Sequence, residues 1–300
     1  MANSTIVPVA SQPTIINPTL HFTNTIITMN LPKLTHQQQA IICLLYRYRF
    51  LDRTHIQALV HHKDKRRIMA WLKDLREKQY VEWIYNKDDF AEKTKPAIYY
   101  LNLNGVLLRA LGEYPVAELR KRYKDSSREQ AFITRSLLIA GSCVNLEART
   151  KSIEDVEYSY VTEADYIDPD NDYHFLEELR PQLCFVKQEG AEAEDSESES
   201  TTIYLLEVFD VTTPRYMVKK RLKDYVTYLD DDDWRADFEG DALIVLIACP
   251  TKPELIYAKR RIGLLLEDGG IELDEDVDIR FATVEQVKQQ GITGMIWEEV

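Results

Sequence analysis

Apolar side chains recur every three to four residues in three successive segments near the start of the chain, and this period predicts three short helices. The segments span residues 35–50, 52–60 and 64–79. Each begins with a residue that favours a helix N-cap, namely Thr35, Asp52 and Asp64. Strand-like runs follow at 80–86 and 97–103, joined by a charged turn. Three helices followed by a hairpin are typical of a winged helix-turn-helix.

The second half of the chain alternates between strand-like and helix-like patterns. Strands are predicted at 156–162, 183–188, 202–211, 242–250 and 277–283. Helices are predicted at 127–149, 214–229, 252–267 and 284–290, the first with apolar positions Phe132, Leu137, Leu138 and Ile139. This alternation indicates an α/β domain with a mixed sheet. The predicted fold class is α+β, an N-terminal winged helix-turn-helix followed by an α/β mixed-sheet domain resembling the restriction-endonuclease-like fold.

These patterns divide the chain into three parts. Residues 1–30 carry no charged side chain and are predicted to form a flexible N-terminal arm. Residues 31–125 are predicted to form the winged-helix domain, and residues 126–300 the α/β nuclease-like domain. The acidic stretch 187–202 has almost no apolar residue and is predicted to be a disordered loop between two strands.

Charge separates the two domains. The formal net charge is -13, but residues 31–150 hold 22 Lys and Arg against 13 Asp and Glu. Residues 151–300 hold 15 Lys and Arg against 37 Asp and Glu. A basic half suits a polyanion, whereas an acidic half avoids one except at a local basic element. Double-stranded DNA is therefore the partner expected for the first domain.

Composition limits the other classes of site and partner. The four cysteines are scattered, which favours buried free thiols over a metal site, and no glycine-rich phosphate loop is present. We expect no cofactor and no metal. No run reaches the length of a membrane span, so we expect a cytoplasmic protein without membrane contact.

The basic residues cluster where a recognition helix needs them. Projected at about 100° per residue, the helix at 64–79 places Ile68, Leu72 and Leu75 on one side and basic residues on the other. Candidate DNA-binding residues on this helix and the hairpin are Lys63, Lys65, Arg66, Arg67, Met69, Ala70, Lys73, Arg76, Lys93 and Lys95. Docking of another protein on the same face is the alternative interpretation.

A carboxylate within an apolar strand, Glu207, raises the question of metal-dependent catalysis. Restriction-endonuclease-like enzymes pair an Asp on one strand with Glu-x-Lys on the next to hold Mg²⁺. This chain has Gln182 and Phe209 at those Asp and Lys positions, so no catalytic residue is assigned. The vestigial candidates are Glu207, Asp210, Lys219 and Lys223, and Mg²⁺ enters only in the nuclease alternative. Otherwise Glu207 pairs with a helix residue such as Arg221.

The order and spacing of several segments resemble the replication-relaxation family of bacterial plasmids, conjugative elements and phages. The similarity runs from about residue 34 to 298 and includes "LTHQQQAIICLLYRYRFLDRTHIQALV", "RRIMAWLKDLREKQYVEW", "LRPQLCFV", "YLLEVFD", "RLKDYVTYL" and "ITGMIW". Family members resemble "PDA" at Pro181 to Leu183, "EVDRGT" at residues 207–213, and a Lys at Arg221. This chain departs from that pattern at Gln182 and Phe209, which argues against a metal site.

The resemblance implies a DNA-binding accessory protein for replication or relaxation of a plasmid or other mobile element. We expect duplex DNA to bind the winged helix. The nuclease-like domain is then catalytically degenerate and serves homodimerisation or contact with a replication or DNA-transfer protein. The alternatives are a metal-dependent DNA-processing nuclease, a winged-helix transcriptional regulator and a protein docking module.

Overall fold

The computed structural model describes residues 32–85, 95–103, 119–120, 122–190, 200–230, 233–238 and 240–300. The predicted arm at 1–30, the hairpin residue Lys93 and the middle of the acidic stretch lie outside the described residues.

The helical part of the molecule, α1 to β3, contains the three predicted helices and the predicted hairpin. Its elements are α1 (His36–Tyr48), β1 (Leu51–Asp52), α2 (Arg53–Leu59), α3 (Lys65–Glu77), β2 (Val81–Ile84) and β3 (Ile98–Leu101). The three strands form an antiparallel sheet in the order β1-β3-β2. The short strand β1 was not predicted, because two residues are too few for a visible alternation.

The predicted N-caps explain where these helices begin. The Thr35 hydroxyl accepts from the Gln38 amide while the Gln38 side chain accepts from Thr35, which closes a capping box. The Asp52 carboxylate accepts from two backbone amides at the start of α2, and Asp64 accepts from the Arg66 amide at the start of α3. All three predicted caps are confirmed.

The sheet part, η2 to β9, is a mixed α/β layer structure, as predicted. Its elements are η2 (Arg122–Ser127), α6 (Gln130–Ser152), β4 (Val156–Thr162), η3 (His174–Glu177), β5 (Leu183–Glu189), β6 (Ser200–Val208), α7 (Arg215–Asp230), α8 (Asp233–Asp237), β7 (Ala242–Cys249), α9 (Lys252–Gly269), β8 (Val277–Thr283), α10 (Val284–Gln290) and β9 (Glu298–Glu299). The strand order is β4-β5-β6-β7-β8-β9, with β6, β7 and β8 parallel and the other pairs antiparallel.

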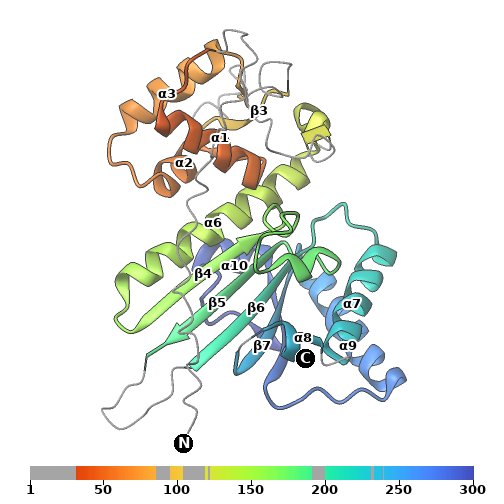
Figure 1. The fold of residues 1–300 in the computed structure, drawn as a ribbon. Helices are drawn as coiled ribbons and strands as arrows, with labels where there is room; N and C mark the ends of the chain where they lie inside the picture. Colours follow the sequence, from red (N-terminus) through yellow and green to blue (C-terminus); the bar gives the residue numbers. More distant parts are fainter. Residues whose placement is uncertain are drawn as a thin grey trace, which may run out of the picture.

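Helices cover both faces of the six-stranded sheet, with α6 and α10 on one face and α7, α8 and α9 on the other (Figure 1). Strand alternation assigns the side chains of β6 to these two faces. Leu206 and Val208 belong to the core under α6, and Ile203 and Leu205 to the core under α7. Glu207 therefore points toward the α7 side.

The long helix α6 lies between the helical part and the sheet (Figure 1). Its Leu138 and Cys143 belong to the same apolar core as Ile41 of α1 and Leu183 of β5. The helical and sheet parts therefore share one continuous core.

The four apolar positions predicted for α6 are covered to different extents, and Leu138 and Ile139 pack in the shared core. Only Leu138 is buried, whereas Phe132, Leu137 and Ile139 are partly exposed. Ile133, Ala140, Cys143 and Leu146 are buried instead. A helix with neighbours on two sides buries different faces along its length, so a single stripe does not describe it.

The predicted disordered loop at 187–202 was too long at both ends. Strand β5 continues to Glu189 and β6 begins at Ser200, with Lys187 opposite Thr202 and Glu189 opposite Ser200. Paired backbone groups hold these polar residues in strands although they contribute little apolar area.

All four cysteines are free and buried, as predicted. Burial raises the pKa of the Cys143 and Cys249 thiols to about 12, so both stay protonated near neutral pH. Within the ranges given above, no helix is both long enough and apolar enough to cross a membrane.

Candidate nucleic-acid interface and the Glu207 cluster

Helix α3 has one buried side and one side in solvent. Ile68, Leu72 and Leu75 are fully covered and pack into the core shared with α1 and α6. The opposite side lies at the outer edge of the helical part, away from the six-stranded sheet (Figure 1). This arrangement confirms the orientation predicted from the helical period.

The exposed side of α3 and the turn before it carry most of the candidate DNA-binding residues. The exposed members are Lys63, Lys65, Arg66, Arg67, Met69, Ala70 and Lys73. The first four cations make no ion pair with any side chain in the described part of the chain. The nearby Asp64 is committed to capping the helix. These cations are therefore available to an external anion.

Polar contacts fix the turn that leads into α3. The Gln57 side chain donates to the Lys63 carbonyl oxygen at 3.1 Å, and the Asp64 amide donates to Nδ1 of His62 at 3.0 Å. The His62 ring also lies edge-on to Trp71, with ring centroids 4.9 Å apart. These contacts connect α2 and α3 to the turn between them, which carries the first of the basic residues.

The remaining candidates on this surface differ in accessibility. Arg76 is half-buried and its guanidinium stacks on the Trp83 ring, 3.6 Å from the centroid. Lys73 pairs with Glu77 at 3.7 Å in an exposed contact. Such an exposed pair contributes little free energy, so Lys73 can exchange Glu77 for a phosphate at little cost. Lys95, next to β3, is exposed.

Glu207 is the centre of a hydrogen-bonded cluster beneath α7. The carboxylate is 5% exposed and accepts from Nη2 of Arg221 at 2.6 Å and from the Tyr225 hydroxyl at 3.0 Å. Arg221 also donates to the carbonyl oxygen of Leu179 at 2.7 Å. Burial raises the pKa of Tyr225 well above its ordinary value, so this hydroxyl stays a donor. The predicted pairing of Glu207 with Arg221 is confirmed.

Gln182 fills the position where the nuclease pattern has an acid. Its side-chain oxygen accepts from the Val208 amide at 2.9 Å, and its side-chain nitrogen donates to the Val208 carbonyl oxygen at 3.2 Å. The Gln182 backbone amide donates to Leu206 at 3.0 Å. A carboxylate accepts but does not donate, so only an amide satisfies both groups of Val208.

Asp210 follows β6 and belongs to a turn rather than to the Glu207 cluster. Its carboxylate accepts from Nη1 of Arg135 at 3.0 Å and from the Thr212 amide at 2.9 Å. Burial alone raises the pKa of Asp210, but bonds from Thr212 and the charge of Arg135 outweigh it, and the pKa lies below its ordinary value. Asp210 therefore joins the start of α7 to α6.

Lys219 and Lys223 are exposed on α7. Helical geometry places them about 200° away from Arg221 around the axis, so Arg221 is the cation of α7 that reaches Glu207. In the ranges that the structure describes, no group of three or more His, Cys, Asp or Glu residues is arranged to hold a metal ion.

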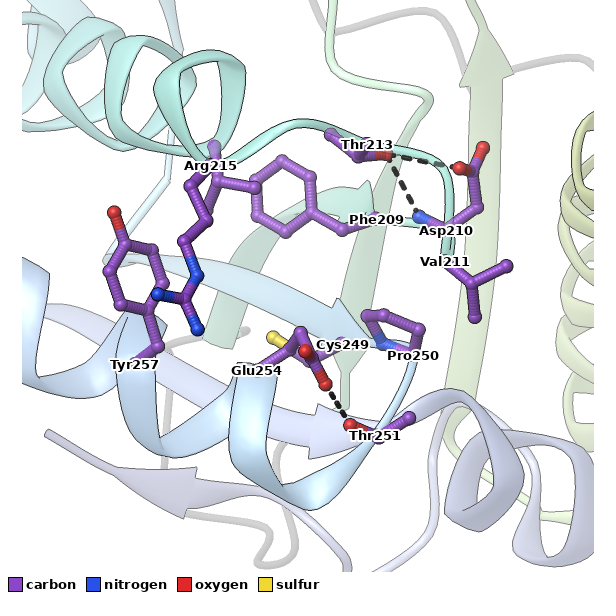
Figure 2. A pocket seen from close by; sticks show the side chains of 11 residues that line it. Phe209, Asp210, Val211, Thr213, Arg215, Cys249, Pro250, Thr251, Glu254 and Tyr257 are labelled. Carbon is purple, nitrogen blue, oxygen red and sulfur yellow. Dashed lines mark hydrogen bonds between the residues drawn. The ribbon is translucent and has the colours of Figure 1, made fainter.

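A pocket of about 130 Å³ lies at the carboxyl ends of β6 and β7, between the first turns of α7 and α9 (Figure 2). Its apolar lining includes Phe209 and Val211. Arg215 reaches across it to the Tyr257 ring, with the guanidinium 4.9 Å from the centroid. Glu254 lines it opposite and bonds to Thr251. The charged residues of its lining are two acids, Asp210 and Glu254, and one cation, Arg215. Asp210 is paired with Arg135, so the two acids do not form a buried carboxylate pair.

Several residues of these clusters were not predicted. Tyr225 stands four residues after Arg221, and this helical spacing is a signal that both side chains reach the same neighbour. Arg135 is 75 positions from Asp210 and carries no such local signal.

The family comparison covers the chain from within α1 to the end of α8. The replication-relaxation family model matches residues 42–238, which include α3, Gln182 and Glu207. The chain belongs to the replication-relaxation family. A search of curated proteins and a search of solved structures each found no match. Membership in the replication-relaxation family indicates a role in replication or relaxation of a plasmid or other mobile element.

Proposed function

We propose that this replication-relaxation protein is a DNA-binding accessory factor that grips duplex DNA through α3. The helical part acts as a winged helix-turn-helix, with α3 in the major groove and the β2–β3 hairpin against the backbone. The sheet part is a nuclease-like domain without catalysis that contacts a second copy or a replication or DNA-transfer protein.

One observation carries this proposal, the concentration of cations at the exposed start of α3. Lys63, Lys65, Arg66 and Arg67 follow one another around the turn and first helical turn, and none is neutralised by a described side chain. Uncompensated like charges repel one another in the free protein. A polyanion removes that repulsion and releases counterions, which gives the binding its driving force.

The order of elements supports the same interpretation. A short strand between α1 and α2, a turn between α2 and α3 and an antiparallel β2–β3 pair give the arrangement in which a winged helix presents its third helix. Arg66 and Lys73 are seven residues apart, two turns along the same side of α3. Both are thus placed to reach one groove.

The contacts of Glu207 support a loss of catalysis in the sheet part. The Glu207 carboxylate accepts hydrogen bonds from Arg221 and Tyr225, and these protein donors occupy the place of a metal ion. Gln182 supplies an amide where the second metal-binding acid is needed. Incubation of plasmid DNA with the protein and Mg²⁺ should therefore give no cleavage beyond that of a Glu207→Ala variant. If the wild type cleaved the plasmid and the Glu207→Ala variant did not, the nuclease alternative would be established.

The deciding experiment is binding of a labelled duplex of mixed sequence against salt. Arg66→Ala/Lys73→Ala should weaken binding at least tenfold and reduce the slope of log K against log salt by about 1 to 2, because each phosphate contact contributes roughly 0.9. The matched control is Arg260→Ala/Lys288→Ala, which removes the same charge from exposed positions of α9 and α10.

The control variant should bind like the wild type. Equal losses in both double variants would mean that net charge, rather than α3, determines binding. No duplex binding by the wild type at low salt would make the basic side of α3 a docking face for another protein.

A further inference from the structure

We propose that the outer side of α7, together with η2, is a second nucleic-acid surface that binds single-stranded DNA. The surface, here called the α7–η2 strip, consists of Tyr216, Lys219, Lys220, Lys223, Tyr123 and Lys124. It lies in the sheet part and shares no residue with α3. The proposal is therefore independent of duplex binding by the helical part.

The charge of α7 is opposite to that of its surroundings. Residues 151–300 hold 37 acidic against 15 basic residues, yet residues 214–223 contain five cations and no acid. Arg221 is used by Glu207, and Arg215 stacks on Tyr257. Lys219, Lys220 and Lys223 are exposed and form no ion pair with the side chains that the structure describes.

Helical spacing brings these lysines together with an aromatic ring. Val218, Leu222 and Tyr225 define the buried side of α7, so the opposite side faces solvent. Tyr216 and Lys220 are four residues apart and lie on one line along that opposite side, with Lys223 on the next turn. The ring of Tyr216 is 72% exposed.

A second exposed tyrosine lies on η2, just before the start of α6. Tyr123 of η2 is 77% exposed, and Lys124 next to it is exposed without an ion pair to a described side chain. Helix α6 begins just after η2, and the bond from Arg135 to Asp210 joins its second turn to the loop that enters α7. Among the described residues, Tyr123 and Tyr216 are the aromatic side chains left largely in solvent.

Acids near the strip are already occupied. Asp125 of η2 is buried and paired with Arg49, Asp210 is paired with Arg135, and Glu207 with Arg221. Asp224, which follows Lys223, lies 3.8 Å from the same Arg221. The lysines of the strip thus face outward without a counter-charge from these neighbours. A polyanion is the partner that fits them.

The two tyrosines decide between single-stranded and duplex DNA. In a duplex the bases are stacked on one another and offer no ring face to a convex protein surface. In a single strand each base can leave its neighbour and stack on an aromatic side chain while lysines follow the phosphates. Exposed rings alternating with lysines are the arrangement that such binding uses.

The test measures fluorescence anisotropy of a labelled oligo(dT) and of a duplex with the full chain. Tyr216→Ala/Lys220→Ala/Lys223→Ala should weaken oligo(dT) binding by roughly tenfold or more. The slope of log K against log salt should fall by about 1 to 2, at roughly 0.7 per phosphate contact. Arg66→Ala/Lys73→Ala should leave oligo(dT) binding unchanged. All these residues are exposed, and circular dichroism checks that each variant is folded.

A second variant, Tyr216→Trp, reports stacking directly. Its emission should be quenched by oligo(dT) and unaffected by poly-glutamate of equal charge. Absence of oligo(dT) binding by the wild type, unchanged binding by the triple variant, or equal affinity for poly-glutamate would each overturn the proposal. If duplex binding failed while oligo(dT) bound through the strip, the function proposed for α3 would be wrong and the strip would stand.

Discussion

At the scale of single residues, the side chains around Glu207 stabilise the sheet, and Gln182 is one example. Gln182 bonds both backbone groups of Val208, the last residue of β6. Replacing Gln182 with glutamate preserves the shape but removes the donor to the Val208 carbonyl oxygen. We expect Gln182→Glu to lower the free energy of unfolding by about 1 to 3 kcal/mol at pH 7, measured by urea denaturation.

The pH dependence of Gln182→Glu tests whether the missing hydrogen-bond donor causes the loss of stability. Once the introduced carboxylate is protonated it regains a donor, so the difference between Gln182→Glu and wild type should narrow as the pH falls below about 5. The control is Gln188→Glu, because Gln188 lies on β5, the strand that begins directly after Gln182, and its side chain bonds to no described residue. Equal losses in both variants would show that added charge, rather than the lost donor, is responsible.

The Asp210 carboxylate gives a second prediction for a single side chain, with a defined pH dependence. Its pKa is lower in the folded than in the unfolded chain, so its contribution to stability is present above the unfolded value of about 3.9 and is lost as the pH falls through the folded value. Asp210→Asn should cost about 1 to 2 kcal/mol at pH 7. The gap from wild type should close below about pH 4 in thermal melts.

At the scale of an element, the capping of α3 determines how firmly the basic surface is held. Asp64 caps the helix through the Arg66 amide at 2.8 Å. Asp64→Ala should destabilise the start of α3 by about 1 kcal/mol. Asp64→Asn removes the same negative charge but keeps a capping oxygen. The two variants thus separate the cap from the charge.

If a rigid α3 is needed for duplex binding, Asp64→Ala should bind more weakly than Asp64→Asn in the same anisotropy titration. Hydrogen exchange of the first amides of α3 should be faster in Asp64→Ala alone. Equal affinities of the two variants would mean that DNA orders this turn by itself.

The sequence correctly predicted features that depend only on residues close together in the chain. The caps at Thr35, Asp52 and Asp64 are each made within three residues of the helix start, and the buried side of α3 follows from period alone. Helix α6 was predicted to exist, but its buried positions depend on two neighbours that meet it from different sides. The pattern of apolar residues within α6 does not show which neighbours will cover it.

The candidate site shows the same division. The pairing of Glu207 with Arg221 was predicted because an acid within an apolar strand needs a cation to neutralise it. In the acidic stretch two predictions overlapped, since composition predicted disorder at Lys187 and Thr202 whereas the strand patterns included both. Pairing between β5 and β6 orders both residues. Long-range contacts such as Arg135 to Asp210 depend on the assembled fold.

For the whole molecule, the shared core implies that the helical and sheet parts unfold together. Arg47 strengthens this connection from α1, with Nη2 2.7 Å from the carboxylate of Asp165 and 3.3 Å from the Tyr160 carbonyl oxygen. Its guanidinium also lies over the Tyr160 ring, 5.2 Å from the centroid. Separation of the parts would leave this buried cation and the surface of α6 without partners.

We therefore expect one cooperative urea transition for the chain. Variants that retain only Trp83, in the helical part, or only Trp234, in the sheet part, should report the same midpoint. Arg47→Met should lower both midpoints equally and reduce the free energy of unfolding by about 2 to 4 kcal/mol, because it leaves Asp165 without its cation. Arg67→Met, at an exposed position of α3, should lower neither. Two separate midpoints would contradict a shared core.

Cooperative unfolding has a consequence for DNA binding that can be measured far from α3. A ligand that binds only the folded chain stabilises it by about 2.7 kcal/mol when its concentration is roughly 100 times Kd. If the two parts unfold together, duplex DNA bound at α3 must shift the transition seen at Trp234 as much as the one seen at Trp83. A shift confined to Trp83 would show that the sheet part unfolds on its own. In that case a partner bound to the sheet part would leave α3 and its affinity for DNA unchanged.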